Sequence, residues 1–321
     1  MKVMITGGTG SLGRALINRL LQTTEVKSIL VLSRDELKQF ELKERLGHPE
    51  KLETIIGDVR DYERTAAAME GCDVVIHTAA LKQVPVCEYN PIEAIRTNIM
   101  GTVNVCQAAH RNDVSKMITI STDKAVNPVN MYGATKLCAE KTAIQANLWG
   151  RTRYSLCRYG NVFMSRGSVV PFFMERVEKG EPIPITHSDM TRFWITLPIA
   201  AEFVLDCVGI MHGGEIFIPK QPSIRIVDLA KAICEDCEFN EVGIRPGEKL
   251  HEVLITRDEV PRTKEHTSYF CIEPAFGVGS KWLGGKKLSE GFQYTSDQND
   301  VWLSVEELRE RVYSEEEGHA R

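Results

Sequence analysis

A glycine-rich turn follows directly on a short apolar strand at the start of the chain. Residues 2–6 read Lys-Val-Met-Ile-Thr, and residues 7–13 read Gly-Gly-Thr-Gly-Ser-Leu-Gly, with a helical pattern after them. Glycines at these positions permit a tight turn and close approach of the backbone to a pyrophosphate, while the first amides of the next helix face the negative charge. A bare structural turn is the alternative, but a place between strand and helix favours a dinucleotide site. The residues predicted to contact the dinucleotide here are Gly7, Thr9, Gly10, Ser11, Leu12 and Gly13.

Short β-rich runs alternate with longer helical patterns through the first half of the chain. Such alternation is typical of βαβ units in a parallel sheet. We therefore expect an α/β fold, a doubly wound parallel sheet of the Rossmann type with a smaller α+β substrate-binding subdomain. The predicted strands are Lys2–Thr6, Ser28–Leu32, Leu52–Ile56, Asp73–His77, Met117–Ser121 and Tyr154–Arg158. The predicted helices between them are Leu12–Leu21, Asp35–Leu46, Tyr62–Met69, Pro91–Ala109 and Met131–Leu148.

Glycine and proline residues break this regular pattern after Arg158, so a second and less regular unit is expected to begin there. Within it the sequence predicts a helix at Thr196–Met211, a strand at Glu215–Pro219 and a helix at Ile226–Asp236. We expect a cofactor-binding domain over residues 1–160, to which residues 196–222 return. The substrate-binding subdomain is then expected over 161–195 and 223–312, and a frayed acidic tail over 313–321.

Charge and composition exclude several classes of protein. The 321 residues include 39 Lys or Arg and 44 Asp or Glu, a formal net charge of −5, which is unlike a polybasic nucleic-acid binder. The longest apolar run is shorter than the roughly 18 residues of a membrane span, and no secretory leader is visible. We therefore expect a cytoplasmic protein without nucleic-acid or membrane partners. No metal site is predicted, because Cys234 and Cys237 have no second ligand pair and are expected to be buried thiols.

The end of the second predicted strand indicates which dinucleotide is bound. An acidic residue there favours the free ribose 2′-hydroxyl of NAD, whereas Arg with Ser favours the 2′-phosphate of NADP. The run Ser33-Arg34-Asp35-Glu36 contains both kinds of residue, but Ser33 and Arg34 come first and Lys38 lies one turn further on. This order favours NADP. Later strands add predicted cofactor contacts at Asp58, Val59, Ala79 and Ala80.

Tyr132 and Lys136 are four residues apart in a helical pattern and therefore share one face of that helix. An ammonium beside a phenol favours the phenolate and is expected to lower the pKa of Tyr132, which would make it a base for an alcohol proton. A Tyr-x-x-x-Lys spacing occurs by chance in many helices. Its position after the fifth strand of a dinucleotide-binding sheet favours the functional interpretation, in which both residues also contact the cofactor.

Taken together, the glycine-rich turn, the run His-Thr-Ala-Ala over 77–80, and Tyr132 with Lys136 resemble the extended short-chain dehydrogenase/reductases. Residues 121–128, Ser-Thr-Asp-Lys-Ala-Val-Asn-Pro, narrow the resemblance. Retaining nucleotide-sugar 4,6-dehydratases have Thr-Asp-Glu at this place, and here Lys124 stands where that Glu would be. This form is similar to the configuration-inverting UDP-N-acetylglucosamine 4,6-dehydratases, which begin pseudaminic acid synthesis. In members that also epimerise, Met replaces the active-site Tyr, so the presence of Tyr132 beside Met131 favours a simple dehydratase.

The resemblance implies a role for each residue of this segment. Tyr132, assisted by Lys136, takes the proton of the sugar C4 hydroxyl while Thr122 hydrogen-bonds the C4 oxygen. Asp123 gives a proton to the departing C6 hydroxyl. Lys124 removes the C5 proton, which requires a lowered pKa; Lys136 and a cationic nicotinamide are expected to lower it.

The substrate is expected to be UDP-N-acetylglucosamine, held by residues from both halves of the chain. Asn161 resembles the family residue that binds the nucleotide diphosphate, and Asn98 matches a helix asparagine whose structural task is to hold a backbone kink or a water. Arginine suits diphosphate oxygens and glutamate suits ribose hydroxyls. Lys82 could contact either ligand. The predicted substrate-binding residues are Lys82, Asn98, Thr122, Asn161, Arg192, Arg245 and Glu248, with Lys82 also counted as a cofactor contact.

Two alternatives stay open. A retaining 4,6-dehydratase or a 4-epimerase shares the fold and the Tyr132 and Lys136 pair. A non-catalytic dinucleotide-binding scaffold belongs to another class and predicts lost catalytic residues, whereas Asp123, Lys124, Tyr132 and Lys136 are all present. The family also implies a homo-oligomer.

Overall fold

The largest element of the structure, a computed structural model that describes residues 1–165, 167–275 and 284–319, is a ten-stranded sheet. Its strand order is β16-β14-β15-β10-β6-β5-β4-β1-β2-β3. The strands from β10 to β3 pair in parallel, and β15, β14 and β16 extend the sheet with antiparallel pairs. The parallel strands are β1 Lys2–Thr6, β2 Ser28–Ser33, β3 Leu52–Ile56, β4 Val74–His77, β5 Lys116–Thr122, β6 Arg153–Tyr159 and β10 Ile216–Pro219. This arrangement confirms the expected α/β fold with a parallel sheet of the Rossmann type.

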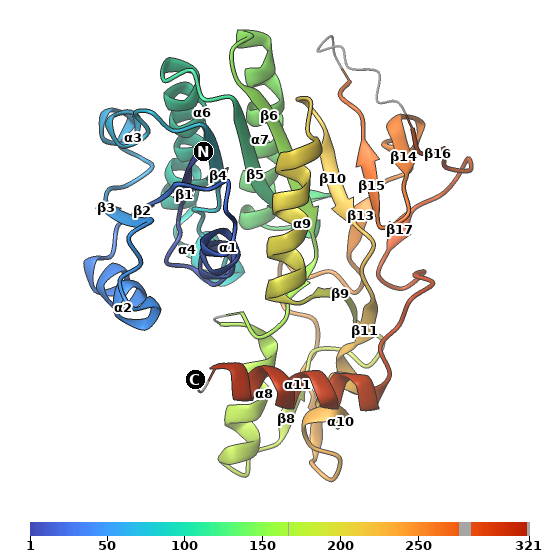
Figure 1. Ribbon diagram of the computed structural model, residues 1–321. Coiled ribbons are helices and arrows are strands. Elements are labelled where there is room, and N and C mark those ends of the chain that lie inside the picture. Colours follow the sequence, from blue (N-terminus) through green and yellow to red (C-terminus); the bar gives the residue numbers. More distant parts are fainter. Residues whose placement is uncertain (166, 276–283, 320–321) are drawn as a thin grey trace.

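Helices cover both faces of the sheet (Figure 1) because alternate side chains of the strands are apolar on both sides. Along β1, Met4 belongs to one buried cluster, and Val3 and Ile5 belong to the other. The first cluster includes side chains from α3, α6 and α7, and the second from α1, α2 and α9. Those helices are α1 Ser11–Leu21, α2 Glu36–Leu46, α3 Tyr62–Ala68, α6 Gly101–Arg111, α7 Met131–Gln145 and α9 Leu197–Ile210.

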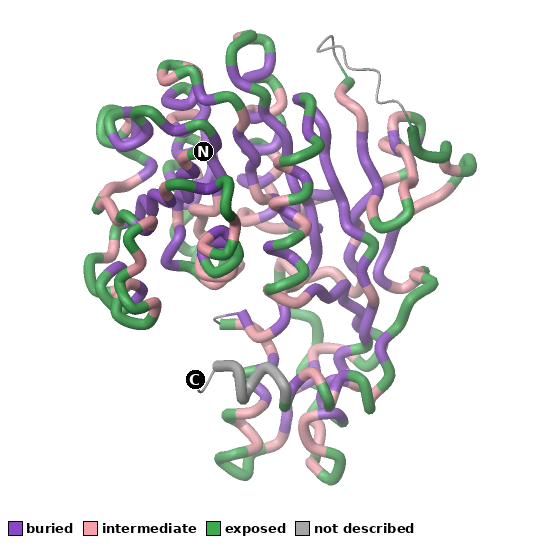
Figure 2. The backbone as a smooth tube through the Cα atoms, in the orientation of Figure 1, coloured by how far each residue is buried: buried purple, intermediate pink, exposed green. Residues whose placement is uncertain are grey.

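A second unit lies below the sheet in Figure 1 and has its own buried cluster. Phe163 packs edge-on against Trp194 there, with ring centroids 4.7 Å apart. Figure 2 shows a buried stretch of backbone running through this unit as well as through the main sheet. Its elements are β7 Asn161–Val162, α8 Val169–Glu178, β8 Ile183–Ile185, β9 Thr191–Ile195, β11 Ser223–Arg225, α10 Ile226–Ile233, β12 Phe239–Glu241 and α11 Val305–His319.

The division between the two units differs in part from the expected one. As expected, α9 and β10 lie with the main sheet. Residues expected in the substrate-binding part, however, also join it: β14 Thr263–Glu265, β15 Tyr269–Ile272 and β16 Lys286–Lys287 extend the sheet, and the hairpin of β13 Val253–Ile255 and β17 Tyr294–Thr295 packs against the same core. These short strands were not predicted, because a strand of only two to four residues is too short to show an alternation of apolar and polar residues in the sequence.

Several other elements differ from the sequence expectations. Helix α4, Val84–Tyr89, was not predicted, and the stretch expected as one helix over Pro91–Ala109 contains α5 Pro91–Ala94, a π-helix at Ile95–Met100 and then α6. The tail expected to fray is instead helical to His319, as the last part of α11. Residues 320–321 of that tail lie outside the described part of the chain. Among the described residues, no helix is both long and apolar enough to span a bilayer.

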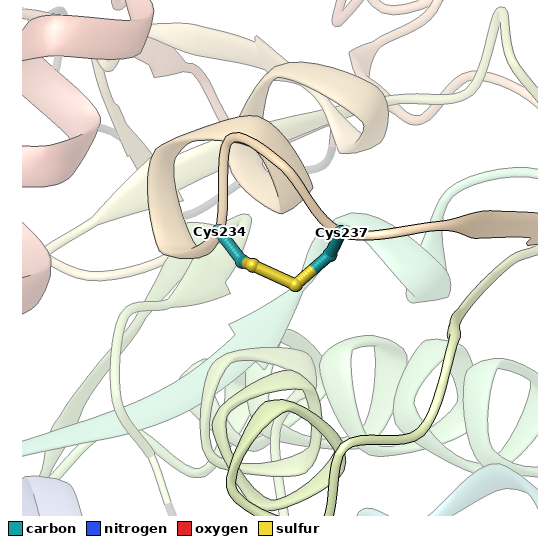
Figure 3. The surroundings of a disulfide bond; sticks show 2 residues. All are labelled: Cys234 and Cys237. Atoms are coloured by element: carbon teal, nitrogen blue, oxygen red, sulfur yellow. A yellow bond between two sulfur atoms is a disulfide. The ribbon is translucent and has the colours of Figure 1, made fainter.

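Cys234 and Cys237 form a disulfide just after α10 (Figure 3), where free thiols were expected. Their Cα atoms lie 5.5 Å apart, within the range that a disulfide requires. Helix α10 ends at Ile233, so the two cysteines lie in the turn after it. The disulfide closes the short loop between them.

Candidate active site

The glycine-rich turn between β1 and α1 presents bare backbone to the carboxyl end of the sheet. Gly7 has a φ of +70°, and a Cβ atom there would lie 2.8 Å from the Cα of Ala79. At Gly13 a Cβ would lie 2.4 Å from the Cα of Gly8, so the helix packs directly on the turn. Gly10 precedes α1 and makes no side-chain cap. The turn thus has the narrow, uncapped helix start that suits a pyrophosphate, and the residues present fit a dinucleotide.

At the end of β2, the predicted cofactor residues differ in whether their side chains are engaged within the protein or exposed. Ser33 is buried, and its hydroxyl accepts a hydrogen bond of 2.9 Å from Gln39 Nε2. Asp35 caps α2 by accepting from the backbone amide of Lys38 and also pairs with the Lys38 ammonium. By contrast, the side chain of Arg34 is 52% exposed, and its Nη1 lies 3.6 Å from Asp58 Oδ2. The carboxylate of Asp35, although 40% exposed, is therefore engaged by Lys38, whereas the side chain of Arg34 extends into solvent. Glu36 begins the first turn of α2.

The predicted cofactor residues after β3 and β4 lie at the same edge of the sheet. Although burial raises the pKa of Asp58, hydrogen bonds from Arg60 lower it below the ordinary value. The Val59 side chain is buried in the core. Ala79 and Ala80 are half-buried, and the Ala79 amide lies 3.4 Å from Thr6 Oγ1. Their small side chains leave this edge open beside the turn at Gly7.

Asp123 and Lys124 form a short 3-10 helix at the carboxyl end of β5. The Asp123 side chain is fully buried, and its Oδ1 accepts from Thr122 Oγ1 at 2.8 Å and from Lys124 Nζ at 3.0 Å. Its other oxygen, Oδ2, is buried and has no hydrogen-bond partner among the described residues. The pair is therefore no surface ion pair, and one carboxylate oxygen is buried without a hydrogen bond from the described residues.

Lys124 reaches beyond Asp123 to two residues from distant segments. Its Nζ donates to Asn161 Oδ1 at 3.1 Å and lies 3.4 Å from Glu252 Oε1. Although burial lowers the pKa of Lys124, the carboxylates of Asp123 and Glu252 raise it above that of an ordinary lysine. The expected lowered pKa is thus wrong for this structure, because two nearby anions outweigh the burial.

Glu252 was not among the residues predicted from sequence, although it lies at the centre of this cluster. Its side chain is 3% exposed, and Arg192 Nε and Lys249 Nζ lie 3.9 and 3.7 Å from its two oxygens. Glu252 directly precedes β13 and lies 128 positions after Lys124 along the chain. No local sequence pattern therefore indicated that Glu252 and Lys124 are close in space. The one available signal was a carboxylate placed before the apolar run Val-Leu-Ile.

Tyr132 and Lys136 both lie on α7, whose first turn is capped by Asn130. Gly133 lets this helix approach the backbone of Lys124, since a Cβ at Gly133 would lie 2.0 Å from the Lys124 carbonyl oxygen. Burial raises the pKa of Tyr132 to about 12, against the expected lowering, although a hydrogen bond with Thr122 and the charge of Lys124 partly oppose the rise. The structure thus brings Tyr132 to the same site as the Thr122 and Lys124 side chains.

Lys136 is buried below the site and donates from Nζ to the carbonyl of Ile120 at 2.6 Å. Burial lowers the pKa of Lys136 to about 8, and the charge of Glu140 partly opposes this. Glu140 in turn pairs with Arg158 Nη2 at 2.7 Å, and Arg158 Nη1 lies 3.0 Å from Glu259 Oε1. This buried ion-pair network, also missed from the sequence, supports α7 from beneath.

The predicted substrate residues are placed in different ways. Arg192 is buried and donates to the carbonyls of Thr191 and Leu250 at 2.7 and 3.1 Å, so its guanidinium is held within the second unit. Arg245 is exposed and paired with Glu248 in the loop between β12 and β13. Lys82 Nζ lies 3.4 Å from Ser165 Oγ.

The side chain of Asn98, predicted as a substrate contact, makes its hydrogen bonds within the protein. It lies in the π-helix and is buried, and its amide oxygen accepts from the Leu81 amide at 2.8 Å. Its Nδ2 donates to the Leu81 carbonyl and to Thr135 Oγ1 at 2.9 and 3.0 Å. These contacts connect the segment after β4 to α7, whereas the resemblance implied that Asn98 holds a backbone kink or a water.

Comparison with known proteins places these residues in a wider group. The sequence matches the family described as "Polysaccharide biosynthesis protein" over residues 3–274. It is 48% identical to a protein of Campylobacter jejuni serotype O:2 named UDP-N-acetylglucosamine 4,6-dehydratase (inverting), over 97% of this chain and 96% of that protein. A Rickettsia conorii protein named UDP-glucose 4-epimerase is 41% identical over 96% of this chain and 94% of its own.

Solved structures give the same picture of the fold. The structure of Pen from Bacillus thuringiensis superposes with a TM-score of 0.91 at 38% identity, covering 98% of this chain and 97% of that one. A dTDP-glucose 4,6-dehydratase from Streptomyces venezuelae, solved with NAD and TYD bound, shares the fold with a TM-score of 0.71 at 19% identity, over 78% of this chain and 87% of its own.

Proposed function

The chain belongs to the polysaccharide biosynthesis protein family, and from that premise we propose that it is an NADP-dependent UDP-N-acetylglucosamine 4,6-dehydratase that inverts C5. The observation that carries the proposal is the Asp123 and Lys124 pair, buried beside Tyr132 at the carboxyl end of β5. The two Campylobacter relatives with the same named activity, each 48% identical, support it. As a hydro-lyase, the enzyme would leave no net redox change.

Tyr132 would accept the proton of the C4 hydroxyl when the substrate binds. A bound nicotinamide supplies the hydride chemistry, taking hydride from C4 and returning it to C6. The phenol has a raised pKa without ligands, so it needs nearby positive charge to act as a base. Lys124 and buried Lys136 are cations at this place, while Thr122, whose hydroxyl donates to Asp123 Oδ1 without substrate, would donate to the C4 oxygen instead.

Asp123 and Lys124 would manage the protons of the elimination. Asp123 Oδ2, unpartnered within the described chain, is the atom placed to carry a proton to the departing C6 oxygen. Lys124 would exchange the proton at C5, which the new 4-ketone acidifies. Because two carboxylates hold Lys124 in the ammonium form, it would first give a proton to Asp123, which would pass a proton to the departing C6 oxygen, and the neutral amine of Lys124 would then take the C5 proton.

The cofactor contacts favour NADP over NAD. Asp35, a carboxylate at the strand end that could accept from a free 2′-hydroxyl, instead caps α2 and pairs with Lys38. Arg34 remains exposed at the strand end, where its guanidinium suits a 2′-phosphate. The remaining predicted contacts, among them Gly7, Gly10, Gly13, Asp58 and Ala79, would line the pyrophosphate, adenine and nicotinamide.

The UDP group would lie between the two units of the chain. Asn161, Arg245 and Glu248 supply the amide, guanidinium and carboxylate suited to diphosphate and ribose, with Lys82 close by. We propose Arg192 as a support of this region, since its guanidinium is bound to backbone carbonyls. We further propose that the enzyme is a cytoplasmic homo-oligomer whose product enters pseudaminic acid synthesis.

A 4-epimerase is the second candidate, because the Rickettsia relatives carry that name. Epimerisation at C4 needs the Tyr132 and Lys136 pair but has no use for an acid at C6 or a proton exchange at C5. The buried Asp123 and Lys124 pair therefore favours dehydration.

Mass spectrometry separates the two candidates. We expect the purified protein with NADP to convert UDP-N-acetylglucosamine to a product lighter by one water. A product of unchanged mass would support the epimerase and contradict the dehydratase. Lys124→Ala should abolish the loss of water, and full activity in that variant would refute its role.

A further inference from the structure

All three hydrogens of the Lys124 ammonium have an oxygen near them. Nζ donates to Asp123 Oδ1 at 3.0 Å and to Asn161 Oδ1 at 3.1 Å, and the third oxygen, Glu252 Oε1, lies at 3.4 Å. An ammonium group has three donors and no acceptor, whereas a neutral amine has a lone pair that would face one of these oxygens. The geometry therefore fits the charged form of Lys124.

Glu252 is fixed by its own surroundings, so its carboxylate does not simply follow the lysine. Its backbone amide donates to Ser296 Oγ at 2.9 Å, and its carbonyl accepts from the Ser296 amide at 2.8 Å. The next residues form β13, which pairs with β17. Its Oε2 is buried and has no hydrogen-bond partner among the described residues. Glu252 is thus a buried carboxylate whose position is fixed by backbone contacts independent of Lys124. A buried carboxylate needs a cation beside it.

We propose that Glu252 is a positioning residue for the dehydration, whose carboxylate holds Lys124 Nζ in place in its ammonium form. The proposal rests on the proposed function, since it assigns a support to the residue that exchanges the C5 proton. Asp123 alone, adjacent in sequence, leaves one side of Nζ open; Glu252 closes it from the segment before β13. The charge state of Lys124 is thereby coupled to the placement of the hairpin of β13 and β17.

Other charged groups also face Lys124 and affect its protonation state. The positive charges of Arg192 and Lys249 disfavour the ammonium, whereas Asp123 and Glu252 favour it. Tyr132, from α7, interacts with Lys124 as well. The titratable groups that face Lys124 are Asp123 on its own segment, Tyr132 on α7, Arg192 on β9, and Lys249 and Glu252 before β13.

The test measures the ionisation of Lys124 directly and without substrate. In the full-length protein, Lys124 is acetylated competitively with acetic anhydride across a pH series, and its modification is followed by mass spectrometry. Glu252→Gln keeps the shape but removes the charge, and we expect the midpoint for Lys124 to fall by about one to three pH units. Glu252→Asp should restore part of the shift. Glu241→Gln, an exposed residue of β12, is the matched control and should leave the midpoint unchanged.

Turnover supplies the second readout. In Glu252→Gln we expect kcat to fall by about 10-fold or more with KM little changed, because the loss of the contact that positions Nζ outweighs the larger fraction of neutral amine. The limb of the pH profile set by Lys124 should move to lower pH by the same interval as the labelling midpoint. An unmoved midpoint overturns the proposal whether or not the protein turns over. If the wild type does not dehydrate UDP-N-acetylglucosamine but the midpoint moves, the proposed function fails and the coupling of Glu252 to Lys124 stands.

Discussion

The amide oxygen of Asn161 lies 3.1 Å from Lys124 Nζ and accepts a hydrogen bond from it. Asn161 begins β7, and Lys124 lies in the segment after β5. Separate roles were predicted for them: Asn161 was expected to bind the diphosphate and Lys124 to remove the C5 proton. Their contact means that a sugar nucleotide held by Asn161 would also meet Lys124. Substrate binding and proton exchange therefore share one polar cluster.

Tyr132→Phe should remove most of the dehydratase activity and leave the fold intact. The phenol lies half-buried at the start of α7, and its hydroxyl is the proposed acceptor of the C4 proton. General base groups contribute about 10² to 10⁴ in rate, so we expect kcat to fall within that range. Tyr89→Phe, at an 87% exposed tyrosine of α4, is the control and should retain full activity. More than a tenth of wild-type kcat in Tyr132→Phe would rule out this assignment.

Arg34→Ala should weaken NADP binding and leave NAD binding unchanged. A hydrogen bond to a charged group contributes about 1.5 to 3 kcal/mol, so we expect the Kd for NADP to rise roughly 10-fold or more. Isothermal titration calorimetry with both dinucleotides measures this, with Lys43→Ala on the neighbouring helix α2 as control. Tighter binding of NAD than NADP by the wild type would contradict the choice of cofactor.

His77 should make the protein less stable as the pH falls below about 6.5. It is buried, with Nδ1 2.7 Å from Thr6 Oγ1 and Nε2 3.1 Å from Thr102 Oγ1, and burial, aided by the charge of Lys136, lowers its pKa to about 3. Between these pH values the unfolded chain binds more protons than the folded one, so the free energy of unfolding decreases as the pH is lowered. The slope from His77 is about 1.4 kcal/mol per pH unit.

Urea denaturation of the wild type and His77→Asn between pH 6 and 4 tests this contribution. The difference between the two curves should change by roughly that slope across the range, because asparagine does not titrate. A constant difference between the two proteins would show that His77 does not carry the effect.

Arg158→Met should destabilise the protein strongly, because it leaves Glu140 buried without its partner. Both side chains are 2% exposed, and Glu140 also accepts from Ser121 Oγ at 2.5 Å. Breaking a buried pair on one side costs about 3 to 5 kcal/mol. Denaturant titration measures the loss, with Arg153→Met at the exposed start of β6 as control. Equal stability of the two variants would contradict the role of the network.

The cofactor half of the molecule followed from local sequence patterns. Apolar strands such as Lys2–Thr6 have the predicted bounds, because a strand buried on both faces is a near-continuous apolar run. The edge strand Leu52–Ile56 also has the predicted bounds. The turn at Gly7 and the placement of Asp123 beside Tyr132 followed from motifs within short segments. Such features depend on neighbours in sequence, which a pattern can detect.

The rest of the site depends on contacts between distant segments. Glu252, Lys249 and Arg192 come together only because β13 and β9 return to the end of β5, and no period in the sequence marks that return. The pKa directions of Tyr132 and Lys124 were predicted wrongly for the same reason: burial and the second carboxylate come from outside the motif. Helix α10 was also predicted to run to Asp236, whereas it ends at Ile233, directly before the Cys234 and Cys237 disulfide.

The configuration at C5 of the product tests the central claim most directly. The protein is incubated with UDP-N-acetylglucosamine and NADP, and the product is analysed by proton NMR before it can isomerise. We expect the 4-keto-6-deoxy sugar with the L-arabino configuration, UDP-2-acetamido-2,6-dideoxy-β-L-arabino-hex-4-ulose. A 4-keto-6-deoxy product with C5 retained, or UDP-N-acetylgalactosamine, would contradict the account.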